Sequence, residues 1–64
     1  MDPEVQQVYD AFFADSKIVL NLLLAIAEAE QRAGIELDEE QMAQLLEQIA
    51  NDLRTGKIRK PYNG

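Results

Sequence analysis

Apolar residues recur along positions 3–33 with the spacing of one face of an α-helix. They lie three and four positions apart, and the same phase continues over eight turns of a helix. The residues in this phase share one side of the predicted helix: Val5, Val8, Tyr9, Phe12, Phe13, Val19, Leu23, Ile26 and Ala33. The pattern predicts a long first helix over residues 3–33.

The ends of this predicted helix carry residues that start and stop helices. Asp2 is suited to cap the amino terminus, and Gly34 to end the helix in a left-handed conformation. Inside the segment, Asp15 and Ser16 interrupt the apolar stripe, and both residue types are good helix caps. The sequence therefore leaves two alternatives, a continuous helix or one that kinks or restarts at this pair.

A second helix is predicted over residues 38–55. Asp38 and Gln41 have the spacing of a capping box, in which each side chain accepts a hydrogen bond from the other residue's backbone. Gly56 follows the segment and is suited to end it. The apolar residues of the segment form one narrow stripe: Met42, Leu45, Leu46, Ile49 and Leu53.

The stretch 18–27 carries more apolar surface than one helix can cover. Its large apolar residues point in many directions around the axis: Ile18, Val19, Leu20, Leu22, Leu23, Leu24 and Ile26. The helix 38–55 offers one apolar side and is about 27 Å long, against about 45 Å for a continuous helix over 3–33. We therefore expect an all-α fold in which two helical hairpins pair into a dimeric helical bundle. A three-helix monomer, folded back at 15–16, is the alternative.

The dimer hypothesis places the apolar residues of the first helix between the two copies. Aromatic residues at helical spacing are more often buried than exposed, which favours this assignment. The predicted interface residues are Val5, Tyr9, Phe12, Phe13, Val19, Leu20, Leu23 and Leu24. Asn21, a polar residue in the apolar stretch, would either fix the register between copies or face water.

Charge is distributed unevenly along the chain. Residues 1–53 contain all twelve acidic residues but only two basic ones, Lys17 and Arg32, whereas residues 54–64 contain four basic residues and no acid. The formal net charge of −6 therefore divides into about −10 and about +4. This asymmetry indicates an acidic helical body and a separate basic segment that meets a partner.

The carboxyl-terminal residues show no helical periodicity, and Pro61 favours an extended conformation for the residue before it. We expect a helical domain over residues 1–56 and a basic extended tail over residues 57–64. The tail residues predicted to bind a partner combine positive charge with apolar anchors: Lys57, Ile58, Arg59, Lys60 and Tyr62. A frayed, solubilising end is the alternative.

The residue types present argue against catalysis. The chain has no cysteine, no histidine, one serine and one threonine, so it lacks a base that titrates near neutral pH and an activated nucleophile. The acidic run at Glu36–Glu40 lacks the spacing and glycine of a calcium loop, and Asp38 to Glu40 lie where a helix start favours acids. We expect no enzyme activity, no cofactor and no metal site.

The longest apolar stretch is too short to cross a membrane. Ile18–Ala27 spans about ten residues, against roughly twenty that a bilayer requires. The acidic first residues do not resemble a secretion signal, so we expect them to be the mature start. The absence of cysteine is consistent with a reducing compartment, and we expect a cytoplasmic protein.

These observations favour a non-catalytic protein–protein interaction module. In this hypothesis a small homo-oligomer regulates, adapts or inhibits a partner protein through its basic tail and the adjoining helical face. One alternative is an oligomeric sponge for a small anion such as a nucleotide, with contacts from Arg59, Lys60, Tyr62 and Tyr9. Direct nucleic-acid binding is not expected, because the acidic body repels phosphate.

Another alternative is that the acidic helices mimic nucleic acid. The acidic residues that would stand for phosphates are Asp10, Glu28, Glu39, Glu40, Glu47 and Asp52. The partner's identity and the oligomer size do not follow from the sequence.

Overall fold

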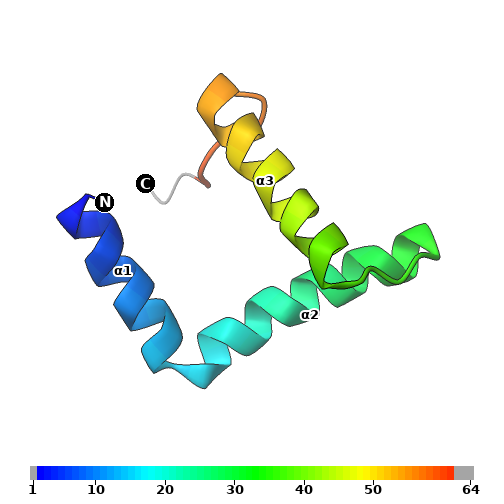
Figure 1. Ribbon diagram of the computed structural model, residues 1–64, viewed down its shortest axis with the longest axis horizontal. Coiled ribbons are helices and arrows are strands. Elements are labelled where there is room, and N and C mark those ends of the chain that lie inside the picture. Colours follow the sequence, from blue (N-terminus) through cyan, green and yellow to red (C-terminus); the bar gives the residue numbers. More distant parts are fainter. Residues whose placement is uncertain (1, 62–64) are drawn as a thin grey trace.

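Three α-helices make up the part of the chain that the computed structural model describes, residues 2–61 (Figure 1). They are α1 (Pro3–Ala14), α2 (Ser16–Ala33) and α3 (Glu39–Thr55). None of the described residues lies in a β-strand. The prediction of an all-α chain is confirmed.

The predicted first helix is divided at Asp15. This residue has an extended backbone, with φ −118° and ψ 109°, and its carboxylate accepts a hydrogen bond from the backbone N–H of Lys17 at 2.9 Å. Asp2 caps α1 in the same way, accepting from the N–H of Glu4 at 2.9 Å. Asp15 is therefore the N-cap of α2, and of the two alternatives the structure shows a restart.

Local capping also sets the limits of α3. The Asp38 carboxylate accepts from the N–H of Gln41 at 2.8 Å, and the Gln41 side-chain oxygen accepts from the N–H of Asp38 at 3.0 Å. Gly34 and Gly56 follow α2 and α3 with φ of 72° and 79°. Only glycine adopts this left-handed conformation without strain, so both helices end where the sequence predicts.

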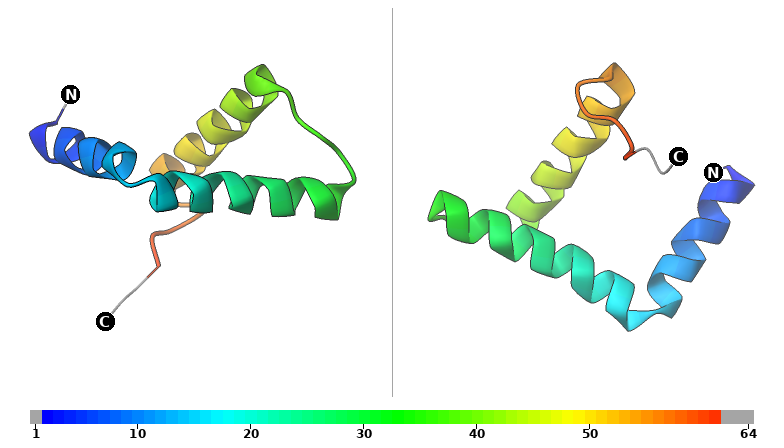
Figure 2. Two further views of the ribbon diagram at one scale, coloured as in Figure 1. Left: turned by 90° about the horizontal axis from the view of Figure 1, so that it is seen from below. Right: turned by 180° about the vertical axis from the view of Figure 1, so that it is seen from behind.

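The helices diverge instead of packing along their lengths. In Figure 1, α1 and α3 rise from the same side of α2, and the views in Figure 2 show the same open arrangement. Within residues 2–61, no two Cα atoms separated by twelve or more positions come within 8 Å of each other. The radius of gyration is 13.5 Å, against about 11 Å for a compact domain of this length.

The single chain therefore has three helices, as in the monomer alternative, but α1 does not fold back on the other two. Residues 34–38 join α2 to α3 without bringing the two helices side by side (Figure 2). The hairpin packing and the pairing of two copies stay predictions.

A small apolar cluster lies where α2, the connection and α3 meet. Ile26 is the one buried apolar residue among those described, with 6% of its surface exposed. Around it lie Ala29, Ala33, Ile35, Leu37 and Leu45. The Glu30 carboxylate accepts a hydrogen bond from the half-buried N–H of Leu37 at 2.6 Å. This bond ties the connection to α2 and holds the start of α3 near Ile26.

We predict that Glu30→Ala lowers the free energy of unfolding by about 1–2 kcal/mol, because the Leu37 N–H loses its acceptor in a partly buried place. Urea unfolding at one fixed protein concentration measures the change. Glu47→Ala is the matched control. It removes an exposed carboxylate of α3, and the expected change is less than about 0.5 kcal/mol. Equal effects of the two substitutions would contradict this role for Glu30.

Candidate functional site

The chain exposes far more surface than a folded monomer of its size. Its accessible surface is 5950 Å² for a mass of 7.2 kDa, whereas the usual scaling with mass gives about 4,100 Å². The difference is about 1,800 Å² per chain. Apolar side chains contribute to it, since fourteen large hydrophobic residues in the described range 2–61 are exposed. Large exposed apolar patches are typical of binding surfaces, so the open helical faces are the candidate site.

On α1 the apolar face is open along its whole length. Val8 is 70% exposed, and the other exposed residues of this face are Val5, Tyr9 and Phe13. Phe12 is half-buried. The ring of Phe13 lies 4.7 Å from that of Tyr9 and 4.9 Å from that of Phe12, measured between centroids. The aromatic residues of α1 thus contact one another along the helix and leave the outer side of the face without cover.

Four polar side chains of α2 form one strip along the helix. At 100° per residue, Lys17, Asn21, Glu28 and Arg32 fall within one narrow sector, and all four are exposed. The apolar residues occupy the remaining sides and do not surround the axis completely. Asn21 is exposed on this strip.

The apolar part of α2 consists of a covered middle and two exposed edges. The covered residues are Val19, Ile26, Ala27 and Glu30, which are buried or half-buried. One exposed edge contains Ile18 and Leu22, and the other contains Leu20 and Leu24, which are 53% and 56% exposed. We call the second the Leu20–Leu24 edge. Because these edges lie on opposite sides of the covered middle, α2 can contact neighbours on both sides.

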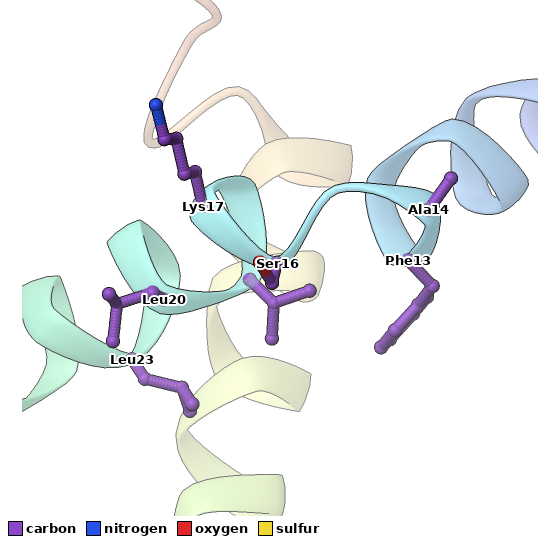
Figure 3. Close-up of a pocket in the computed structure, with 7 residues that line it drawn as sticks. Phe13, Ala14, Ser16, Lys17, Leu20 and Leu23 are labelled. Carbon is purple, nitrogen blue, oxygen red and sulfur yellow. The ribbon is translucent and has the colours of Figure 1, made fainter.

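A hollow lies beside the Leu20–Leu24 edge, at the bend between α1 and α2. It has a volume of about 580 Å³ and is lined by Phe13, Ala14, Ser16, Lys17, Val19, Leu20 and Leu23. In Figure 3 the side chains of Phe13 and Leu23 project to the same side of the chain, whereas Lys17 projects to the other. The hollow is therefore an apolar recess with a cation at its margin.

On α3 the exposed apolar residues lie beyond the cluster around Ile26. Leu46, Ile49 and Leu53 are 41%, 37% and 51% exposed, whereas Met42 and Leu45 are half-buried. The sequence predicts one apolar side on this helix, made of these residues. The divergence of α3 from α2 leaves its distal part open.

The basic segment after α3 begins with an ordered turn. The N–H groups of Lys57 and Ile58 both donate to the carbonyl of Asp52, at 2.9 and 3.3 Å. Beyond this turn, Arg59 and Lys60 are exposed and are not part of a helix.

The cations of this segment are not neutralised within the described chain. Arg54, Lys57, Arg59 and Lys60 form no ion pair with any residue in 2–61. Four positive charges therefore face solvent at one end of α3. Ile58, 40% exposed, stands beside them. Tyr62, the remaining predicted tail contact, lies outside the described residues.

The predicted interface residues all lie on open or half-open surface. Six are exposed, and Phe12 and Val19 are half-buried. The interface prediction omitted Val8, Ile18, Leu22, Leu46 and Leu53, which are equally open. Val8 was detectable, because it belongs to the helical stripe of α1. The openness of the α3 residues was not detectable, because it depends on the angle between two helices.

Within residues 2–61, no three potential metal-binding side chains are gathered into a metal site. The described helices include none with the length and hydropathy that a bilayer crossing needs. Comparison of the chain with protein-family models, with curated proteins and with solved structures finds no match in any of the three. The function therefore has to be argued from the surface of this chain alone.

We predict that Val8→Asp weakens self-association by at least about tenfold, because it places a charge on the most exposed residue of the apolar face of α1. Sedimentation velocity over a range of protein concentrations measures the effect. Ala11→Asp is the matched control, since Ala11 is an exposed residue of α1 whose helical spacing places it on the polar side. If the two variants associated equally, the apolar face of α1 would not be part of an interface.

Proposed function

We propose that this chain is a non-catalytic interaction protein that associates with itself through its exposed apolar helical faces and binds another protein through its basic segment. In this proposal the assembly is the functional unit. It acts as a small regulator, adaptor or inhibitor by occupying a surface of its target. The absence of cysteine from the sequence favours the cytoplasm as its compartment.

The observation that carries the proposal is the surplus of about 1,800 Å² of exposed surface per chain, which includes apolar faces on all three helices. A stable protein–protein interface buries about 800 Å² on each partner. The surplus is large enough for self-association and for a second, smaller contact. Since one chain buries only Ile26 fully among its described residues, association would supply most of the hydrophobic stabilisation.

The basic segment is suited to a different partner from the apolar faces. It presents Arg54, Lys57, Arg59 and Lys60 next to the exposed Ile58, with no acidic residue in between. A complementary surface is acidic with an apolar recess, as on a protein that recognises basic extended peptides. The acidic bodies of other copies compete only weakly for these cations, because exposed ion pairs contribute little.

We predict that the triple substitution Lys57→Gln, Arg59→Gln and Lys60→Gln weakens binding of the target by about tenfold, because three exposed cations are lost. It should leave the helical content and the mass of the assembly unchanged. The measurement compares the proteins captured from cell extract by the unchanged chain and by the triple variant. It then titrates each captured protein against both forms at two salt concentrations.

Arg32→Gln is the control, since it removes a cation of α2 that lies far along the chain from the basic segment. It should capture the same proteins as the unchanged chain. If the triple variant captured them as well, with equal affinity, the basic segment would have no part in binding.

A further inference from the structure

We infer that the Leu20–Leu24 edge of α2 packs against the same edge of a second copy, with the two α2 helices antiparallel about a twofold axis. The inference deepens the proposed function, because it names the surface and geometry of self-association. It depends on the chain associating with itself at all, and the experiment below separates the two.

The exposed area favours a second copy as the occupant of this edge. A twofold contact that buried the whole surplus would cover about 3,600 Å² in total, within the 2,000–5,000 Å² that is typical of obligate homodimers. In a twofold contact the same patch is used on both sides, so a patch must be complementary to itself. The Leu20–Leu24 edge meets this condition, because leucines project beside an apolar recess into which leucines fit.

The charges favour α2 over the other two helices as the place where copies meet. Each chain carries a net charge of −6, so two copies repel each other at long range. On α2 the cations Lys17 and Arg32 balance the acids Glu28 and Glu30. By contrast, α1 contains two acids and no cation, and α3 contains four acids and one cation. Two copies therefore approach with the least repulsion along α2.

Greater exposure and the adjoining hollow favour this edge over the opposite one, where Ile18, Leu22 and Ala25 have the same spacing. Leu20, Leu24 and Ala27 follow one another at intervals of four and three, the spacing of a seam between two packed helices. The hollow at the bend, with Phe13 and Leu23 on one side of the chain, lies next to this seam (Figure 3). A Leu24 of the second copy that lies level with Leu20 can enter the hollow, because Leu20 lines it.

The direction of the second helix follows from Lys17. In an antiparallel pair, let the twofold axis cross each α2 helix at the level midway between residues 20 and 24. Leu20 of each copy then lies opposite Leu24 of the other. Lys17 then lies level with Ala27 of the second copy, and Glu28 of that copy is the next residue. Both Lys17 and Glu28 are exposed at the margin of the seam, so two ion pairs can form across the axis. A parallel pair would instead bring Lys17 next to Lys17.

Disulfide trapping tests the contact, and the chain suits it because it contains no cysteine. Equal amounts of the Leu20→Cys and Leu24→Cys variants are mixed, dissociated, reassociated and oxidised. We expect the mixed covalent dimer to exceed, by about tenfold, the mixed dimer formed when Ala25→Cys replaces Leu24→Cys. Ala25 is the exposed neighbour of Leu24, turned by about 100° around the helix. Equal yields from the two mixtures would overturn the inference.

Charge exchange provides a second measurement, in case a cysteine variant assembles poorly. Lys17→Glu and Glu28→Lys should each weaken self-association by about fivefold, and the double variant should restore it. Within one helix these residues are eleven positions apart, about 16 Å, so a rescue reports a contact between chains. If the double variant were as weak as the single ones, the antiparallel arrangement would be wrong.

Light scattering on the unchanged chain separates a failure of this particular contact from a failure of self-association as such. A mass above that of one chain, with no preferential trapping and no rescue, would overturn this contact and leave the proposed function standing. A monomer at every concentration would overturn both.

Discussion

The hydrogen bond from the N–H of Lys17 to the Asp15 carboxylate determines what this chain can bury. At 2.9 Å it begins a new helix where the apolar stripe would otherwise continue, and the extended backbone of Asp15 turns α1 away from the line of α2. The apolar face of α1 then stays open among the residues that the structure describes. The open shape and the exposed leucines of α2 follow from this bend and from the divergence of α3.

The sequence was sufficient for the features that depend on neighbouring residues. Asp38 with Gln41, and Gly34 and Gly56, mark helix ends through hydrogen bonds and backbone conformations that span only a few residues. A break at Asp15 was one of two alternatives, because an aspartate followed by a serine is compatible both with a continuous helix and with a cap that starts a new one. Only the backbone conformation of Asp15 distinguishes the two.

The features that depend on the angles between helices could not be predicted. Leu46 and Leu53 share a stripe with Met42 and Leu45, yet only the latter pair is half-buried, because α3 leaves α2 beyond the cluster around Ile26. That direction depends on one hydrogen bond between residues seven positions apart in the sequence, from the N–H of Leu37 to the Glu30 carboxylate. A glutamate on the apolar side of a helix gives no sign in the sequence of which N–H it will bind.

The proposed function assigns different roles to two kinds of surface. Apolar faces are suited to another copy, because apolar burial is not directional and does not require a specific charge pattern. The cations after α3 are suited to a separate target, because electrostatic complementarity confers specificity and fast association. The near-neutral α2 allows two chains of like charge to meet, while the basic segment stays outside their contact.

The central claim is that a single copy of this chain is incomplete and that folding and association are coupled. Thermal unfolding at protein concentrations that span three orders of magnitude tests it most directly, with circular dichroism to follow the helices. The account predicts that the midpoint temperature rises steadily with concentration, because association stabilises only the folded chain. A midpoint that stays constant over the whole range, with full helicity at the lowest concentration, would contradict it.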